Sequence, residues 1–175
     1  MSAPADGLSL RDGRPDDRAS VEAVTLAAYE QYAAVLPGPF WAAYRQNILA
    51  TLAAADPSTL ILAETAGAVV GSVLLCPPGA VIPDPGIGRD IRFAVPEVRL
   101  LAVAPAGRGH GVGRRLMEEC IRRARAAGAP ALTLHTTDIM SVAMRLYERM
   151  GFARAVELDF SPAPGMLVKG YRLGL

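Results

Sequence analysis

The segment that most constrains this chain runs from Val98 to Gly113 and reads VRLLAVAPAGRGHGVG. Its first half is apolar and typical of a buried β-strand, and its second half is a glycine-rich turn. A long amphipathic run follows at once, which indicates that the turn opens a helix. Backbone N–H groups of such a turn point toward one spot, with the positive end of the helix behind them. The pattern therefore predicts an anion-binding strand–turn–helix unit.

Strand and helix patterns are mixed along the rest of the chain. Apolar runs bounded by turn residues predict strands over residues 8–11, 59–64, 69–75, 96–103, 131–135, 152–160 and 166–173. Ala66-Gly67 is the predicted hairpin turn between the second and third of these strands. Helical periodicity predicts helices over residues 15–35, 40–54, 111–127 and 138–150, the last capped by Thr137 or Asp138. Gly128 and Gly151 are expected to end the last two helices. Pro77–Arg92 holds four prolines and three glycines and is interpreted as an irregular loop. We expect an α/β fold, with one mixed sheet of about six to seven strands and about four helices on both faces.

Bulk composition narrows the class of protein. The chain has 175 residues, 51% hydrophobic and 20% charged, which is typical of a globular protein with one core. We expect a single domain over residues 8–175 and a flexible stretch over residues 1–7. A net charge of +1 gives no argument for a nucleic-acid partner, and no apolar run reaches the length of a membrane span. A cytoplasmic protein with two free buried thiols, Cys76 and Cys120, and no metal site is the expectation.

Three known kinds of phosphate-binding turn are compared with this one. A P-loop requires Lys and then Ser or Thr after its last glycine, but Arg114 and Arg115 follow Gly113. A dinucleotide fingerprint requires a third glycine three residues after the second, and Arg114 or Leu116 stands there. The third kind is a coenzyme A pyrophosphate turn. A glycine-rich connection that binds nothing remains the alternative.

Two motifs give the chain a resemblance to a known family. Arg108-x-x-Gly111-x-Gly113 follows a strand and opens a helix, and Leu146-Tyr147-x-x-x-Gly151-Phe152 lies downstream. Both resemble the signatures of the GNAT superfamily of N-acetyltransferases, over about residues 8–175. The resemblance implies a sheet that is splayed at the cofactor site and an acetyl-CoA donor. It also implies transfer to a primary amine of a small molecule or peptide, by direct attack in a ternary complex.

The resemblance also implies roles for particular residues. The donor would be held by Leu101, Ala102, Val103, Arg108, Gly109, His110, Gly111, Val112, Gly113, Arg114, Met140, Ala143 and Tyr147. Family members often carry Asn where this chain has Met140, so its contact is lost or taken over by Thr137, Asp138 or Ser141. Arg114 could equally belong to a solvated helix surface.

Two residues are candidates for acid–base catalysis. Tyr147 is at the position of the family's usual proton donor to the leaving thiolate, although its ring could simply pack in the core. Glu97 begins the central strand and is the candidate base for the amine. Alternation would place Glu97, Arg99 and Leu101 on one strand face. The alternatives are an exposed Glu97 paired with an arginine, or a reaction without a dedicated base.

The acceptor side is less constrained by the sequence. The candidate acceptor residues are Tyr29, Glu30, Tyr32, Trp41 and His135, although the aromatic rings could instead pack helix on sheet. The 77–92 loop could form a rim of the site. A monomer or homodimer is expected. Two other functions stay open: a non-catalytic acetyl-CoA-binding sensor or subunit and, more distantly, a dinucleotide-binding oxidoreductase.

Overall fold

The computed structural model describes residues 7–84 and 89–175, which form two compact units. The first unit contains the residues up to Leu75 together with Leu100–Cys120, and the second contains Cys76–Arg99 and Ile121–Leu175. Strand β6 (Glu97–Val103) and helix α3 (Val112–Ala126) each contribute residues to both units. Residues 1–6, most of the stretch expected to be flexible, lie outside the described residues. Within the described part, no helix is long and apolar enough to cross a membrane.

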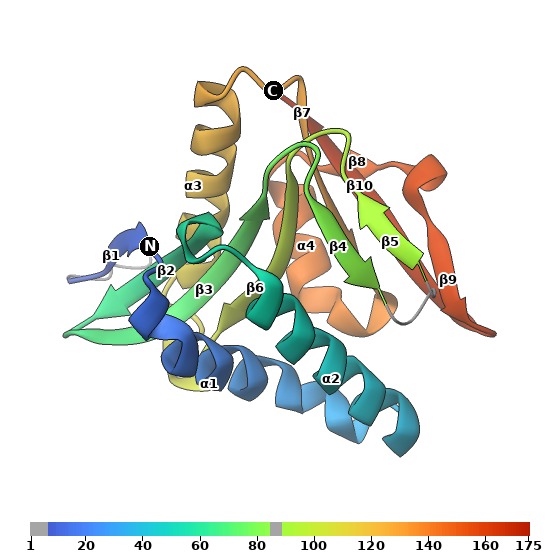
Figure 1. Cartoon of the computed structure of the whole chain (residues 1–175), viewed down its shortest axis with the longest axis horizontal. Helices are drawn as coiled ribbons and strands as arrows, with labels where there is room; N and C mark the ends of the chain where they lie inside the picture. Colours follow the sequence, from blue (N-terminus) through green and yellow to red (C-terminus); the bar gives the residue numbers. More distant parts are fainter. Residues whose placement is uncertain (1–6, 85–88) are drawn as a thin grey trace. The chain divides into compact units, whose positions relative to one another are not determined.

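The strands of the first unit follow the order β1-β2-β3-β6 (Figure 1). They comprise β1 (Ser9–Asp12), β2 (Leu60–Thr65), β3 (Ala68–Cys76) and the end of β6. β2 pairs antiparallel with both β1 and β3. The hairpin turn expected between β2 and β3 is confirmed, because Ala66 and Gly67 have φ angles of 50° and 78°. Two consecutive positive φ angles are what a tight two-residue hairpin turn requires.

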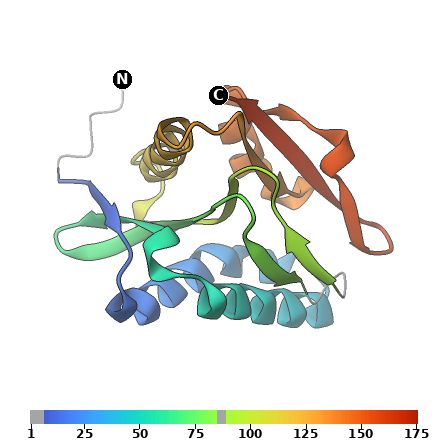
Figure 2. The same cartoon turned by 45° about the horizontal axis from the view of Figure 1, so that its top comes forward.

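Helices lie on both faces of β3 in this unit, as expected. The helical segments are η1 (Pro15–Asp17), α1 (Arg18–Tyr29), η2 (Glu30–Ala34), α2 (Gly38–Ala54), η3 (Pro57–Thr59), η4 (Pro105–Gly107) and the start of α3. Thr25 of α1 hydrogen-bonds Ser72 of β3 at 3.4 Å. A Cβ built on the neighbouring Gly71 would lie 2.8 Å from Val112 of α3. Because neighbouring strand residues face opposite sides, α1 and α3 cover opposite faces. Helices α1 and α2 lie side by side in both views (Figures 1 and 2).

A charged cluster fixes the beginning of the first unit. The guanidinium of Arg11 on β1 donates to both oxygens of Asp17, at 2.7 and 2.8 Å, and to Glu64 of β2, at 2.6 Å. The hydrogen bond from Arg11, assisted by the amide of Arg14, lowers the pKa of Asp17 to about 2. The cluster therefore ties η1 to the strands through an interaction that requires an ionised Asp17.

The second unit is built around β7 (Ala131–Thr136) and the long strand β10 (Met166–Gly174) (Figure 2). β7 pairs with the beginning of β6 in parallel and with β10 antiparallel, and β10 also pairs with β8 (Ala153–Arg154) and β9 (Phe160–Ala163). The helical segments are η5 (Asp138–Met140), α4 (Ser141–Arg149) and η6 (Val156–Leu158). Over the residues that the structure describes, the sheet has eight strands, one or two more than expected. The predicted strand over 152–160 is instead divided by η6, which accounts for part of the difference.

The expectation of an irregular 77–92 loop is wrong. Strands β4 (Val81–Asp84) and β5 (Arg89–Arg92) pair antiparallel, with Val81 opposite Arg92 and Ile82 opposite Ile91. The backbones of Gly79 and Ala80 extend this pairing through hydrogen bonds with Phe93, at 2.8 and 3.2 Å. Both strands of a two-stranded sheet are edges, where proline is tolerated, so the proline content did not exclude strand structure. Residues 85–88, part of the same prediction, lie outside the described residues.

The predicted helix ends have mixed outcomes. Gly128 and Gly151 follow α3 and α4 with φ angles of 70° and 92°, as expected for left-handed helix-terminating glycines. The amide of Ala129 donates to the carbonyl of Ala124 at 3.0 Å, the wider hydrogen bond of that motif. The predicted side-chain cap by Thr137 or Asp138 is wrong, because neither η5 nor α4 has one. The carboxylate of Asp138 instead accepts a hydrogen bond from Lys169 at 2.5 Å. Cys76 and Cys120 are both buried thiols, as expected.

Candidate donor and acid–base sites

The glycine-rich turn lies wholly within the first unit, between β6 and α3. Gly109 and Gly111 have φ angles of 79° and 76°, and both are exposed. A Cβ built on either glycine would meet no atom within 4 Å. Positive φ therefore explains the glycines, and the space above the backbone is open to a ligand. His110 between them is exposed as well.

The beginning of α3 supplies backbone donors beside this turn. The amide of Arg115 donates to the carbonyl of Gly111 at 3.0 Å, which is the first hydrogen bond of the helical pattern. The amides of Val112, Gly113 and Arg114 precede that bond. At a helix N-terminus such amides and the helix dipole together favour an anion. The turn is thus chemically suited to a phosphate group.

The two arginines of the turn have different contacts. Arg108 donates to the carbonyl of Ala28 in the last turn of α1, at 3.1 Å, so its guanidinium holds the turn against α1. Arg114 pairs with Glu118 on the surface of α3 at 2.7 Å, and its side chain is 69% exposed. This pair corresponds to the solvated helix surface that was the alternative for Arg114.

Strand β6 changes conformation halfway along. Leu100 has a φ of 51°, which is rare for a branched side chain and interrupts the strand geometry. The expected placement of Glu97, Arg99 and Leu101 on one face assumed regular alternation, and alternation does not continue through this position. Ala102 is buried, whereas Leu101 and Val103 are half-buried. Their backbones follow the irregularity directly, in the first unit.

The segment from Met140 to Tyr147 lies in the second unit. Met140 and Ala143 are half-buried, and Tyr147 of α4 is buried with its ring 6.1 Å from that of Phe152. The hydroxyls of Thr136 and Thr137 are buried and have no hydrogen-bond partner among the described residues. A buried hydroxyl without a partner costs free energy unless water or a ligand satisfies it. Thr137 thus has an available hydroxyl beside the position where the family carries Asn.

Glu97 is the centre of a buried polar network. Its side chain is only 2% exposed, so it is not the exposed residue of the alternative interpretation. One carboxylate oxygen, Oε1, lies 2.6 Å from Nδ1 of His135, and the other, Oε2, accepts a hydrogen bond from the hydroxyl of Thr133. The partner is therefore a histidine rather than an arginine. Thr133 and His135 alternate with leucines on β7, so both lie on the polar face of that strand.

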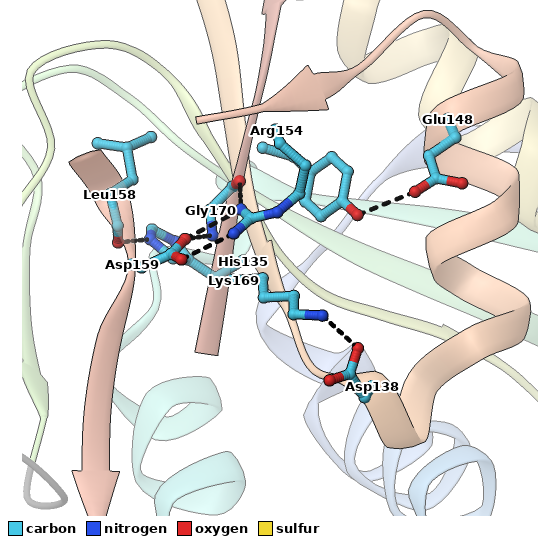
Figure 3. Close-up of polar contacts among 9 residues, drawn as sticks. His135, Asp138, Glu148, Arg154, Leu158, Asp159, Lys169 and Gly170 are labelled. Carbon is cyan, nitrogen blue, oxygen red and sulfur yellow. Dashed lines mark hydrogen bonds and ion pairs between the residues drawn. The ribbon is translucent and has the colours of Figure 1, made fainter. Parts of the chain in front are cut away.

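His135 links Glu97 to the segment after β8. Its Nε2 lies 3.0 Å from the carbonyl oxygen of Leu158 in η6, as Figure 3 shows. Burial lowers the pKa of His135, but the hydrogen bond and charge of Glu97, together with the Leu158 carbonyl, raise it by more. The net result is a pKa above the ordinary value of 6.5. The ring of Phe160 packs edge-on against the imidazole at 5.5 Å.

A second ionic contact holds the same segment and was not predicted. Arg154 binds both carboxylate oxygens of Asp159, at 2.9 and 2.7 Å, and donates to the carbonyl of Gly170 at 2.5 Å (Figure 3). The amide of Gly170 donates back to Asp159 at 2.8 Å. The Arg154 guanidinium also lies over the ring of Tyr171, 5.3 Å from its centroid. In the sequence, the polar face with Thr133 and His135 was indicated only by polar residues that alternate with apolar ones in a strand. No sequence pattern indicated the contact between Arg154 and Asp159.

The candidate acceptor residues other than His135 gather on α1, η2 and α2. The rings of Tyr29, Tyr32, Tyr44 and Trp41 form a chain of edge-to-face contacts, with centroids 5.8 to 6.3 Å apart. Tyr29 is buried, whereas Tyr32 and Trp41 are half-buried. Burial raises the pKa of Tyr32, and the nearby charge of Arg108 opposes that shift. Glu30 is exposed. The cluster combines core packing with partly accessible ring surface.

Comparison with known proteins identifies similar sequences and structures. A model of the acetyltransferase (GNAT) family matches residues 22–152. A mycothiol acetyltransferase from Cellulomonas flavigena is 35% identical over 111 residues, which are 62% of this chain and 31% of that protein. An IAA acetyltransferase from Azospirillum brasilense is 38% identical over 105 residues, 60% of each chain. The chain therefore spans less than two thirds of the length of either relative.

Solved structures show the same fold. One is a GNAT family acetyltransferase from Brucella melitensis in complex with acetyl-CoA. It matches with a TM-score of 0.56 and 25% sequence identity, over 96% of this chain and 88% of that chain.

Proposed function

The chain belongs to the GNAT family of acetyltransferases, and we propose that it transfers an acetyl group from acetyl-CoA to a primary amine of a small molecule or peptide. The observation that carries the proposal is the glycine-rich turn. Gly109 and Gly111 open their backbone to a ligand, and α3 begins directly after them. A pyrophosphate is a dianionic group that such a turn can bind through amides alone. The acetyl-CoA-bound relative from Brucella melitensis supports the choice of donor.

The residues present fit acetyl-CoA at two separate places. Open space above Gly109 and Gly111 accommodates phosphate oxygens close to the backbone. In the second unit, the hydroxyl of Thr137, which no described residue hydrogen-bonds, can bond an amide of the donor where the family's Asn is replaced by Met140. Bound acetyl-CoA supplies a thioester, whose carbonyl carbon an amine can attack. We assign the backbones of Leu101 and Val103 to holding its acyl arm.

Tyr147 is proposed as the acid that protonates the leaving thiolate. It lies in α4 within the Leu146–Phe152 motif, and Phe152 packs against its ring. A phenol with an ordinary pKa near 10 can donate to a thiolate of similar basicity. Burial of the ring keeps the hydroxyl in one position, which favours a directed proton transfer.

Glu97 is proposed to act on the acceptor side, where the attacking amine must lose its proton. The carboxylate is buried at the beginning of β6 and engages His135. The aromatic cluster with Tyr32 and Trp41 is proposed to contact the acceptor through its half-buried rings. Aromatic faces bind apolar groups and also cations, so either part of an organic amine can be recognised there.

Mass spectrometry of a panel of amines, amino acids and peptides incubated with the protein and acetyl-CoA tests the transfer. An acetylated product that depends on the protein supports the proposal. Binding of acetyl-CoA without any product would instead favour the sensor or subunit function. Thermal stabilisation by NADH but not by acetyl-CoA would refute the donor assignment.

The acid role is tested by Tyr147→Phe. Because a positioned acid contributes about 10²-fold or more, we expect kcat to fall by at least about 10²-fold. The dissociation constant of CoA, measured by calorimetry, should change less than about twofold, because the substitution does not alter the glycine-rich turn. Tyr171→Phe is the matched control, because the Tyr171 hydroxyl bonds Glu148 at 3.0 Å and has no proposed chemical role. Equal kcat in Tyr147→Phe and wild type would remove the acid role.

A further inference from the structure

The carboxylate of Glu97 is closed off from any acceptor. Its side chain is 2% exposed, one oxygen lies against His135, and the other accepts from Thr133. The imidazole of His135 is 24% exposed and is thus the member of the pair that solvent reaches. A proton arriving from an amine or a water molecule meets the ring before it meets the carboxylate.

Counting protons in the pair shows where such a proton can be held. The carbonyl of Leu158 can only accept a hydrogen bond, and so can an ionised Glu97. An imidazolium, in which both ring nitrogens donate, satisfies both acceptors, whereas a neutral ring beside an ionised Glu97 has a single N–H and satisfies only one of them. A protonated Glu97 that donates to Nδ1, with Nε2–H donating to Leu158, holds the same number of protons. The arrangement with both bonds is the protonated state of the pair.

We propose that the acceptor-side base of this enzyme is the Glu97–His135 pair, in which His135 takes the proton and Glu97 remains a carboxylate that orients the ring. This inference rests on the proposed acetyl transfer. It reassigns the proton from Glu97, the predicted base, to a histidine on the neighbouring strand. Glu97 and Thr133 then act as positioning residues.

The step is balanced as follows. At the start, a neutral imidazole lies beside an ionised Glu97: Nδ1–H donates to Glu97, and Nε2 carries no proton. The amine nitrogen forms a bond to the thioester carbonyl carbon, and its proton passes, directly or through water, to Nε2 of His135. The carbon–sulfur bond breaks, and the thiolate takes the proton of Tyr147. The Nε2–H of His135 then donates to the Leu158 carbonyl, which lies 3.0 Å away. His135 finally releases its proton to solvent, and Tyr147 regains one from solvent.

The surroundings of the ring bias it toward holding that proton. Glu97 on the same side of the sheet favours the charged form, and Arg99 on β6 opposes it. The ionised Asp159 after η6 interacts electrostatically with the ring. Across β10, the residue opposite His135 is the uncharged Gly170, and β9 contributes the apolar ring of Phe160. Together these surroundings place the pKa of His135 above its ordinary value of 6.5.

Nuclear magnetic resonance tests the pair without any kinetics. The chain has two histidines, so the resonances of His135 are those that disappear in His135→Gln. In wild type we expect its titration midpoint above 6.5, and in Glu97→Gln we expect it lowered by about one pH unit or more, because the opposing charge is gone. Glu157→Gln, which removes an exposed carboxylate, is the matched control and should leave the midpoint unchanged.

Kinetics then test the assignment of the proton. For an acceptor found by the amine panel, kcat/KM in wild type should rise with pH along a limb whose midpoint equals that of His135. The limb should move to lower pH in Glu97→Gln and vanish in His135→Gln, with at least about a 10²-fold loss at pH 8. Thr133→Val should retain this rise of kcat/KM with pH, because the contact between His135 and Glu97 is not removed.

The outcomes separate this inference from the proposed function. A kinetic limb that keeps its position in Glu97→Gln, while the resonance midpoint moves, would overturn the inference and leave acetyl transfer intact. Equal loss of activity at every pH in His135→Gln, with the limb retained, would show a merely structural histidine and also overturn it. Absence of any acetylated product would refute the proposed function, while the resonance titration would still report on the pair.

Discussion

Gly170 is the position where one methyl group should perturb the second unit most. A Cβ at this position would lie 2.9 Å from the carbonyl oxygen of Ala155 and closer still to Cβ of Leu158. Neither atom is the far end of a flexible side chain, so the backbone around η6 must move. Gly170 also takes part in the Asp159 and Arg154 hydrogen bonds, which a displaced strand would lengthen.

The magnitude follows from overpacking. Forcing one methyl group into a filled space costs about 1–3 kcal/mol, and loss of the hydrogen-bond geometry places Gly170→Ala near the upper end. In a chain of this size, 1 kcal/mol lowers Tm by about 2–4 °C. We therefore expect Gly170→Ala to lower Tm by about 4–12 °C in a thermal unfolding scan.

Gly174→Ala is the matched control on the same strand. A Cβ there would meet no atom within 4 Å, and the φ of Gly174 is not in the left-handed region. Its Tm should equal that of wild type or rise slightly, because alanine restricts the unfolded chain. If Gly170→Ala unfolded within 1 °C of Gly174→Ala, the packing of η6 against β10 described above would be wrong.

Two further predictions concern the first unit. Gly111→Ala should weaken CoA binding at least about tenfold in calorimetry, because a methyl group would occupy the ligand side of the turn. Gly67→Ala, with a similar φ of 78° and equally open surroundings, carries the same strain and should leave CoA binding unchanged; equal affinities in both variants would refute the donor site. For Asp17, a folded pKa of about 2 against an ordinary value of 3.8 means that its stabilisation is complete above about pH 4 and is lost toward pH 2. Urea midpoints of Asp17→Asn should thus be lower than wild type at pH 7 and converge with it near pH 2, and a constant difference over this range would contradict the role of Arg11.

Local sequence information was sufficient for the elements that obey local rules. The amphipathic stripe of α3, the Ala66-Gly67 hairpin and the glycine ends of α3 and α4 depend on periodicity and on φ preferences that each residue carries with it. The glycine turn was predictable for the same reason. The β4–β5 pair was missed because proline content signals irregular backbone, while pairing with another strand is not a local property.

The sequence by itself determined the family and the strand–turn–helix unit with its glycine turn, and it indicated Tyr147 and Glu97 as candidates for the acid and the base. The tertiary structure decided the surroundings of Glu97. Residues 36 to 38 positions away, Thr133 and His135, occupy both oxygens of Glu97, and the Leu158 carbonyl completes the network. A sequence records a glutamate in the same way whether its carboxylate is solvated or buried. The neighbours that influence protonation are brought together only by the fold. The positive φ of Leu100 is equally a product of the fold, since nothing in its own side chain favours that conformation.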